Sequence, residues 1–477
     1  MEGGPTGSGE PEMPSVMDTI SVEDLDERAR ALADASERNT HWRREACINL
    51  IPSEQPVSKY VAALSAADPA ARYNEHRRQT PEGPEVRYYK GTSFIMEKEE
   101  ELKAALCAFF NCARAEVRVI SGQMANDAVF DALVQFRNRG GKGQELARLR
   151  PVLVHDLVKG GHLSAQPMGA LKNYVAIEPG TGKPAALHFP ARADSPYRID
   201  VDQTKALIRQ TPPQLVVFGR SVIIHREPVA EIAAFIQDEF GKDNPDRPLI
   251  MYDGAHVLGL LGPAFQDPLA EGADIVTGST HKTFFGPQRG VILSNIQAGS
   301  AFEGLWRHIE TRTFPGHVSN HHLGTMLGLL GATYEMLTFK DAYPAQVVCN
   351  AKAFAAALRG QGLTIEGDPA DGFTETHQVL LNVAPGKGDW AASHFEVNNI
   401  ITNHQALFTD PNFAEASGVR LGVQEMTRHG MKEADFEPLA ALMGDILREG
   451  DDRPEGSWRD AVKSLRSGFT EMQYCVS

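Results

Sequence analysis

Residues 249–256 read LIMYDGAH, an apolar run that ends directly at Asp253 and a turn of small residues. Such a run suits one buried strand, and its carboxylate then lies at the C-terminal end, where open α/β sheets bind ligands. About 30 residues further on, the stretch STHKT at 279–283 places Lys282 among small hydroxylic residues. Taken alone, Asp253 is equally well explained as a helix cap or a loop ion pair, and Lys282 is more simply a solvated loop lysine.

Short apolar runs of this kind recur before and after residues 249–256 in the sequence, and they alternate with amphipathic helical stretches. The alternation predicts a mostly parallel sheet covered by helices on both faces. The predicted helices include Met124–Phe136 and Val229–Phe240. The predicted strands are Val117–Ile120, Val152–Val154, Tyr174–Ile177, Leu215–Phe218, Leu249–Tyr252, Ile275–Val276 and Val291–Leu293.

The pattern changes after an apolar helix predicted at Leu323–Leu337. The segments Val347–Leu358, Val379–Val383 and Phe436–Leu447 then predict a smaller α+β domain. Residues 1–16 are rich in Gly, Pro, Glu and Ser, which is typical of disorder, and Ser21 is expected to cap a helix. We therefore expect a disordered tail and N-terminal helical arm at 1–45, a large domain at 46–335 and a small C-terminal domain at 336–477.

The composition is that of an ordinary soluble globular protein, with 477 residues, 42% of them hydrophobic, and a net charge of −15. The acidic balance argues against a nucleic-acid or anionic-membrane partner, and no apolar stretch is long enough for a membrane span. Without a secretory signal, we expect a cytoplasmic protein. The cysteines, which form no Cys-x-x-Cys pair and predict neither a disulfide framework nor a zinc ribbon, are Cys47, Cys107, Cys112, Cys349 and Cys475.

A third candidate group comes earlier in the chain than Asp253 and Lys282. The turn Ser121-Gly122-Gln123 opens a predicted helix, whose free N–H groups and positive end suit a phosphate, although such a pair is more often plain turn chemistry. Pyridoxal phosphate needs an anion cradle, a carboxylate for its pyridine nitrogen and a Schiff-base lysine. The three groups occur here together and favour that cofactor.

Seven motifs in order carry a resemblance to a known family. They are LIPSE (50–54), RYNE (72–75), RYY (87–89), GGHL (160–163), DGAH (253–256), THKT (280–283) and VRLG (419–422). Over about 47–447 the chain resembles serine hydroxymethyltransferase and its threonine aldolase and transaldolase relatives. These are fold-type I pyridoxal phosphate enzymes, so the resemblance implies a seven-stranded, mostly parallel sheet sandwiched by helices, with a smaller C-terminal domain.

The resemblance also implies roles at the cofactor. Lys282 would form the Schiff base, Asp253 would pair with the pyridine nitrogen, and His162 would stack on the ring. The further cofactor contacts implied are Ser221 and His256 near the phenolic oxygen, His281 beside the lysine, and the N–H groups of Gly122 and Gln123 at the phosphate.

For the substrate, the resemblance implies that Arg420 and Ser53 bind the carboxylate; a structural ion pair is the alternative for Arg420. Residues corresponding to Tyr73, Glu75 and Tyr89 come from the neighbouring subunit in such enzymes. This implies a homodimer with shared active sites, alone or paired into a tetramer. The catalytic residues implied are Lys282, Glu75, Tyr73, Tyr89, His162 and Thr280.

In this chemistry the cofactor stabilises a carbanion at the α-carbon of the amino acid, and the carboxylate clamp selects the bond that breaks. Glu75 or a tyrosine takes the proton of the β-hydroxyl group. The substrates are small molecules, namely an amino acid and an aldehyde.

Four stretches depart from the hydroxymethyltransferase pattern: a long loop at 76–86, no Gly-Gly-Pro in 314–321, Gln123-Met124 in the phosphate turn, and no Gly-Thr-Pro in 422–428. The last of these, with Ser319-Asn320 and 373–378, is more similar to the L-threonine transaldolases of natural-product pathways. The leading hypothesis is therefore a biosynthetic transaldolase, with a threonine aldolase side activity, that takes L-threonine and an acceptor aldehyde and releases acetaldehyde.

The alternative is a tetrahydrofolate-dependent serine hydroxymethyltransferase, favoured because Glu75, Leu157 and Gly161 are retained. A catalytically silent subunit that only binds the cofactor is disfavoured by the intact lysine, aspartate and arginine. No metal site is expected, since His321-His322 would be adjacent on a helix and would not share a face.

Overall fold

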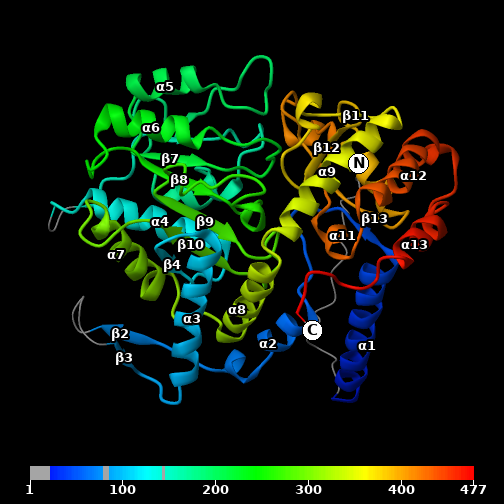
Figure 1. Cartoon of the computed structure of the whole chain (residues 1–477), viewed down its shortest axis with the longest axis horizontal. Helices are drawn as coiled ribbons and strands as arrows, with labels where there is room; N and C mark the ends of the chain where they lie inside the picture. The colour runs from blue at the N-terminus through cyan, green and yellow to red at the C-terminus, as the bar shows by residue number, and fades with distance from the viewer. Residues whose placement is uncertain (1–21, 79–84, 142–144, 477) are drawn as a thin grey trace, which may run out of the picture.

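The computed structural model describes residues 22–78, 85–141 and 145–476 (Figure 1). The tail predicted at 1–16 and the cap predicted at Ser21 lie outside these ranges. No helix within them is long and apolar enough to cross a membrane.

A seven-stranded sheet forms the centre of the larger part of the molecule, in the order β4-β10-β9-β8-β7-β5-β6 (Figure 1). The strands from β9 to β6 are parallel, whereas β10 is antiparallel to both β9 and β4. This confirms the predicted α/β class with a mostly parallel seven-stranded sheet. The strands are β4 (Arg114–Glu116), β5 (Val152–Val154), β6 (Ala186–His188), β7 (Leu215–Phe218), β8 (Leu249–Asp253), β9 (Ile275–Ser279) and β10 (Gly290–Ser294).

Alternate strand residues face two separate cores, as the pleat of a strand requires. In β8, Ile250 and Tyr252 belong to one core, and Leu249 and Met251 to the other. The first core also holds residues of α3, α6 and α8, and the second holds those of α4 and α7, so helices cover both faces. The helices are α3 (Ser93–Phe110), α4 (Gly122–Arg137), α5 (Val201–Gln210), α6 (Val229–Phe240), α7 (Glu303–Thr311) and α8 (Leu323–Thr338).

Two of the predicted strands are wrong. The run Val117–Ile120 is the connection from β4 into α4, because the sheet edge pairs the preceding residues, Arg114–Glu116, with β10. The run Tyr174–Ile177 makes only single bridges to Leu149 and Pro184, and Ala186–His188 takes its place beside β5. The apolar character of both runs reflects burial in the core and not pairing in a ladder.

The C-terminal part has a four-stranded antiparallel sheet in the order β11-β12-β15-β14, with helices packed around it. One early strand, β1, pairs with β13 in this part of the chain, although it falls within the range predicted as the large domain. The domain boundaries stay a prediction. The elements are β1 (Ile48–Asn49), α9 (Ala342–Gly360), β11 (Thr364–Ile365), β12 (Gln378–Asn382), α10 (Gly388–Glu396), β13 (Ile400–Ile401), β14 (Asn403–Gln405), β15 (Gly418–Gly422), α11 (Gln424–Arg428), α12 (Phe436–Glu449) and α13 (Arg459–Ser467).

The N-terminal elements lie along the lower side of the molecule in Figure 1. The exposed helix α1 (Val22–His41) projects from the C-terminal part, and α2 (Lys59–Ser65) packs on α8. Strands β2 (His76–Arg78) and β3 (Glu85–Arg87) form a hairpin. Side-chain caps fix where helices begin: Ser58 Oγ accepts the N–H of Val61 at the start of α2, as Ser121 does for α4.

Candidate active site

The carboxylate of Asp253 ends strand β8 and is buried. Its Oδ2 accepts hydrogen bonds from Asn126 Nδ2 at 2.8 Å and from Ser164 Oγ at 3.2 Å. Its Oδ1 accepts the backbone N–H of Ala255 at 3.1 Å. The carboxylate of Asp253 therefore caps no helix and accepts hydrogen bonds from three donors.

His162 lies beside this carboxylate, with Nδ1 2.8 Å from Asp253 Oδ2. Burial acts to raise the pKa of Asp253, but His162 and the hydrogen bonds outweigh it and hold that pKa well below the ordinary value. Asp253 is thus an ionised acceptor. The ring of His162 also meets that of His256 edge-on, with centroids 5.6 Å apart.

Lys282 lies in the turn between β9 and β10 and is buried, so it is not a solvated loop lysine. Burial lowers its pKa to about 8, helped by the charge of Arg420 and opposed by that of Asp253. A lysine of this kind has a substantial neutral, nucleophilic fraction near pH 8. The neighbouring His281 has its pKa lowered to about 4 by burial and by Lys282.

Thr280 holds this turn together and was predicted as a catalytic residue. Its hydroxyl donates to the carbonyl of Pro287 at 2.6 Å and accepts the N–H of Arg289 at 3.1 Å. Its own carbonyl accepts the N–H of Gly286 at 2.7 Å. The side chain therefore fixes the path of the loop that carries Lys282.

The N-terminus of α4 reaches the same end of the sheet. A Cβ atom on Gly122 would lie 2.2 Å from Ser279 Oγ, and one on Gly290 would lie 2.2 Å from the carbonyl oxygen of Ser121. Only glycine allows the helix start to approach β9 and β10 so closely. The predicted phosphate turn, which includes Gln123, is thus brought beside the lysine loop.

Arg420, on β15, comes to this site from the C-terminal part. Its Nη1 donates to the carbonyl of Ser221 at 3.0 Å, and its buried Nε has no partner among the described residues. Burial lowers its pKa to about 10. Among the described residues no carboxylate pairs with Arg420, and a buried guanidinium without a carboxylate favours an anionic ligand.

Four residues at the site were not singled out from the sequence as site residues. Gln378 Nε2 donates to the carbonyl of Ser221 at 3.0 Å and lies 3.5 Å from His256 Nδ1. The pKa of the buried His377 is lowered to about 3, by burial first and also by Arg420 and Lys282. Asn126 and Ser164 are the other two. Asn126 lies one helical turn after Gly122, which could have placed it at the sheet.

Other predicted site residues are not brought to Asp253 and Lys282. Tyr73 and Tyr89 are 46% and 45% exposed, with ring centroids 5.2 Å apart. No contact among the described residues joins them, or the half-buried Glu75, to the two central groups. Ser53 is half-buried in the turn after β1, next to Pro52.

The predicted histidine pair 321–322 does not lie on a helix, since α8 begins after it. His321 Nε2 contacts Glu99 Oε2 at 3.1 Å. In the described ranges no group of three or more His, Cys, Asp or Glu side chains could hold a metal ion.

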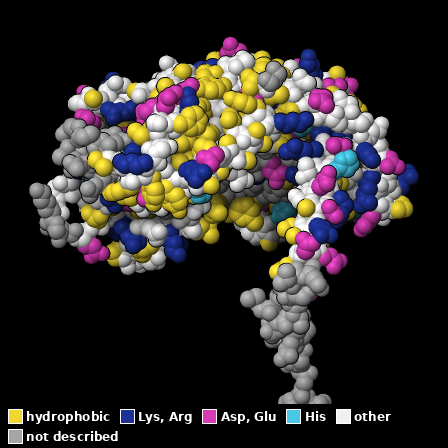
Figure 2. Space-filling model, turned by 90° about the horizontal axis from the view of Figure 1, so that it is seen from below, with side chains coloured by type: hydrophobic (Ala, Val, Ile, Leu, Met, Phe, Trp, Pro, Cys, Tyr) yellow, Lys and Arg dark blue, Asp and Glu magenta, His cyan; other side chains and the backbone are white. Residues whose placement is uncertain are grey.

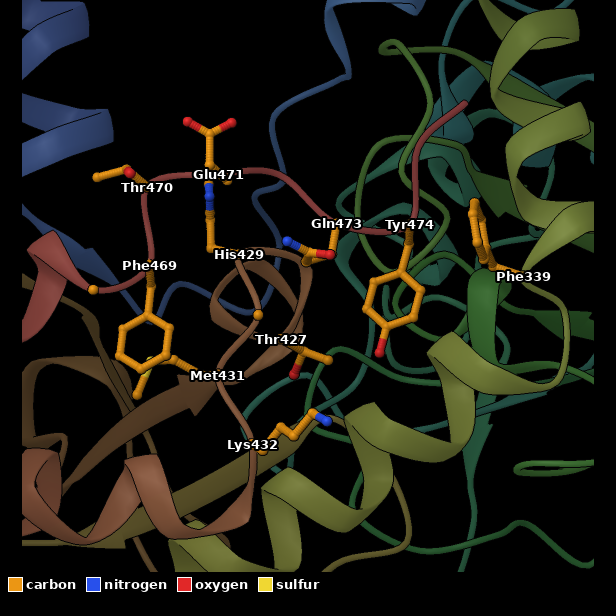
Figure 3. A pocket seen from close by; sticks show the side chains of 12 residues that line it. Phe339, Thr427, His429, Met431, Lys432, Phe469, Thr470, Glu471, Gln473 and Tyr474 are labelled. Atoms are coloured by element: carbon orange, nitrogen blue, oxygen red, sulfur yellow. The ribbon is translucent and has the colours of Figure 1, made fainter. Parts of the chain in front are cut away.

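A cavity of about 460 Å³ opens elsewhere, between the segment after α11 and the C-terminal tail (Figure 3). Its lining includes Thr427, His429, Glu471 and Tyr474, and none of the site residues described above. The candidate active site is therefore defined by its converging side chains and not by this cavity.

Comparisons with known proteins agree with this arrangement. The family model for serine hydroxymethyltransferase matches residues 25–443. The serine hydroxymethyltransferase of Thermococcus gammatolerans is 38% identical over 444 residues, 92% of this chain and 94% of that protein. That of Archaeoglobus fulgidus is 36% identical over 442 residues, 92% of this chain and 91% of that protein. The crystal structure of L-threonine transaldolase from Pseudomonas fluorescens in its internal aldimine state gives a TM-score of 0.78 at 25% identity, covering 95% of this chain and 96% of that one.

Proposed function

The chain belongs to the serine hydroxymethyltransferase family and is a pyridoxal phosphate-dependent transferase, and we propose that it transfers the glycyl unit of L-threonine to a second aldehyde. The first product is acetaldehyde and the second is a new β-hydroxy-α-amino acid. One observation carries this proposal: two of the stretches that depart from the hydroxymethyltransferase pattern, at 76–86 and 314–321, contact each other beside Glu75, while Lys282, Asp253 and Arg420 are all present.

The contacts around Glu75 are specific. The ring of His76 stacks on Phe314 with centroids 4.9 Å apart. Asn74 Nδ2 donates to Glu99 Oε2 at 3.4 Å, and the same oxygen contacts His321. His76 thus contacts the segment 314–321 directly, and Asn74 contacts it through Glu99. These contacts support a changed binding site for the aldehyde.

The residues present fit pyridoxal phosphate. Lys282 offers a buried amine, Asp253 an ionised carboxylate and Gly122 a helix start, while Nδ1 of His281 and Nε of Arg420 are buried without a partner among the described residues. When bound, the cofactor supplies a carbonyl carbon that bonds amines and a conjugated ring that takes up an electron pair.

The chain's own groups then have separate tasks. Arg420 holds the substrate carboxylate through its fork of N–H donors and so fixes which α-carbon bond faces the ring. Glu75 accepts the proton of the β-hydroxyl group as the bond between the α- and β-carbons breaks. Lys282, with its pKa near 8, returns a proton to the α-carbon when no acceptor aldehyde is present.

A specific observation favours a second candidate, a tetrahydrofolate-dependent serine hydroxymethyltransferase. The relatives at 38% and 36% identity carry that name, and they support it at least as strongly as the structural neighbour supports the first candidate. The retention of Glu75, Leu157 and Gly161 points the same way.

The two candidates differ in what L-threonine yields without folate. We expect the cofactor-loaded protein to release acetaldehyde from L-threonine, at a rate that rises with added acceptor aldehydes; alcohol dehydrogenase and NADH absorbance measure it. A Lys282→Ala variant is the control. No release, together with tetrahydrofolate-dependent conversion of L-serine to glycine, would establish the second candidate instead.

We also propose a homodimer with shared active sites. Five aromatic side chains in α2, in the start of α3 and in the segment between them are 39–55% exposed, and hydrophobic side chains gather on the lower face (Figure 2). An exposed apolar patch of this kind is typical of a protein interface. The five are Tyr60, Tyr73, Tyr88, Tyr89 and Phe94.

Subunit mixing tests this arrangement. If Glu75 serves the partner's Lys282, a dimer of one Glu75→Gln and one Lys282→Ala subunit keeps one intact site. After unfolding and refolding an equal mixture of the two inactive variants, we expect about a quarter of the wild-type activity. Half the dimers are then mixed, and each mixed dimer keeps one of its two sites intact. Sites confined to one chain would give no recovery.

A further inference from the structure

The loop at 50–56 joins β1 to α2 and carries Ser53, yet it has no regular secondary structure. What fixes such a loop is the set of groups that bind its backbone. Here those groups come from His377 just before β12, from the end of β15 and from the short helix α11. The sequence of the last two, 422–428, is one of the stretches that depart from the hydroxymethyltransferase pattern.

Gln424 makes the most direct contacts with this loop. It is buried, and its Nε2 donates to the carbonyl of Ile51 at 2.8 Å and to that of Glu54 at 2.9 Å. These carbonyls flank the pair Pro52-Ser53 on both sides. One side-chain amide therefore spans the backbone that carries Ser53.

Two neighbouring groups support the same loop. His377 Nε2 lies 3.1 Å from the carbonyl of Pro52, and Arg428 Nη1 donates to that of Pro56 at 2.7 Å. A Cβ atom on Gly422 would lie 2.5 Å from Pro52 Cα, so the end of β15 touches the loop directly. Because β15 also carries Arg420, the same strand positions both the loop and the arginine.

Glu425 belongs to a polar cluster that contacts the loop at Glu54. Asn49 Nδ2 donates to Glu425 Oε2 at 2.6 Å and to Glu54 Oε2 at 3.2 Å, and Arg43 pairs with Glu54. Burial and the charge of Glu54 raise the pKa of Glu425 to about 7, against the effects of Asn49 and Arg43. The other titratable groups facing Glu425 are Cys47, Arg428 and Arg466.

We propose that Gln424 and Glu425 are positioning residues that hold the Ser53 loop for the carboxylate of the amino-acid substrate. Gln424 fixes the loop backbone, and Glu425 sets how firmly Asn49 holds Glu54. The inference rests on the proposed carboxylate site at Arg420 and Ser53. It does not depend on which aldehyde or folate serves as the second substrate.

The first test replaces the amide with an apolar group of similar length. For cofactor-loaded Gln424→Met, we expect the Kd for glycine, measured by calorimetry, to rise about tenfold, because two buried carbonyls lose their donor. The KM for the amino acid should rise similarly, with kcat changed less than about twofold. Gln346→Met, at a half-buried glutamine that bonds Asn350 in α9, is the matched control and should leave the Kd unchanged.

An unchanged Kd in a folded, cofactor-loaded Gln424→Met protein would overturn the role of Gln424. Glycine binds in both candidate reactions, so this result is independent of acetaldehyde release.

The second test uses pH and serves even where Gln424→Met does not fold. Above pH 7, ionised Glu425 draws Asn49 away from Glu54 and loosens the loop, whereas Glu425→Gln stays neutral. We expect the ratio of the glycine Kd of wild type to that of Glu425→Gln to rise about threefold from pH 6 to pH 8. A constant ratio would overturn the role of Glu425.

Discussion

Replacing Lys282 with alanine should lower the turnover of either candidate reaction by about a thousandfold or more, because the change removes both the amine that bonds the cofactor and the base that moves the α-proton. The amine is buried, and its pKa lies near 8 because burial disfavours its charged form. No other lysine is described at this site, so no neighbour can take over its role. The loop itself should survive, since Thr280 and Gly286 fix it through other atoms.

Whether the protein retains its cofactor and its thermal midpoint distinguishes the loss of the Lys282 amine from misfolding. Wild-type protein should keep its visible absorbance through desalting, whereas Lys282→Ala should lose it while keeping its thermal midpoint within a few degrees. Lys159→Ala, at a lysine bonded to the carbonyl of Asp410, is the matched control and should keep both. Full activity in Lys282→Ala would contradict the cofactor assignment.

The pH dependence follows from the same group. Lysine is nucleophilic only when neutral, so the rate at which cofactor-free protein takes up pyridoxal phosphate covalently should rise with pH and level off above about pH 8. Stopped-flow absorbance measures this rate. A rise that continues to pH 10 would show that Lys282 has an ordinary pKa.

The sequence predicted most of the sheet because its strands are buried on both faces. Runs such as Leu215–Phe218 and Leu249–Tyr252 are apolar throughout, and both lie in strands as expected. The prediction failed at the sheet edges. There Arg114–Glu116 pairs through its backbone alone, and its side chains gave no signal of a strand.

The site was predicted where a residue type limits the chemistry, as for Lys282, Asp253 and Arg420. Site residues were missed where a common side chain reaches the site only through the fold. Asn126 and Gln378 are ordinary amides in the sequence, and only the fold brings one to the carboxylate and the other to His256. Gln424 belongs to the same class, since its role appears only when the loop at 50–56 is seen against α11.

Changing Asp253 to asparagine should lower kcat/KM by about a hundredfold to a thousandfold, the second large effect expected here. Asn126 Nδ2, Ser164 Oγ and the N–H of Ala255 donate hydrogen bonds to this carboxylate, and His162 Nδ1 lies 2.8 Å from its Oδ2. An amide keeps one acceptor oxygen and turns the other position into a donor, which then meets another donor. The change therefore removes the negative charge and breaks the geometry that fixed it.

The direction of the pKa shift makes this prediction sharper. Because the pKa of Asp253 lies well below its ordinary value, the carboxylate stays charged throughout the working range, and wild-type activity should show no titration of this group between about pH 5 and pH 9. The deficit of Asp253→Asn should accordingly be constant over that range. A deficit that shrinks toward pH 5 would mean that the wild-type carboxylate is already protonated there.

Exchange of the glycine α-proton in heavy water, followed by NMR, is the measurement to use, since it needs neither an aldehyde nor folate. The matched control is Asp200→Asn, because Asp200 caps α5 through an oxygen that the amide retains. We expect that control to exchange within about twofold of wild type, since an Asn cap replaces an Asp cap at little cost. Equal exchange rates in Asp253→Asn and wild type would show that the electron pair on the α-carbon is stabilised without this carboxylate, and the cofactor's partner would then have to be sought elsewhere in the site.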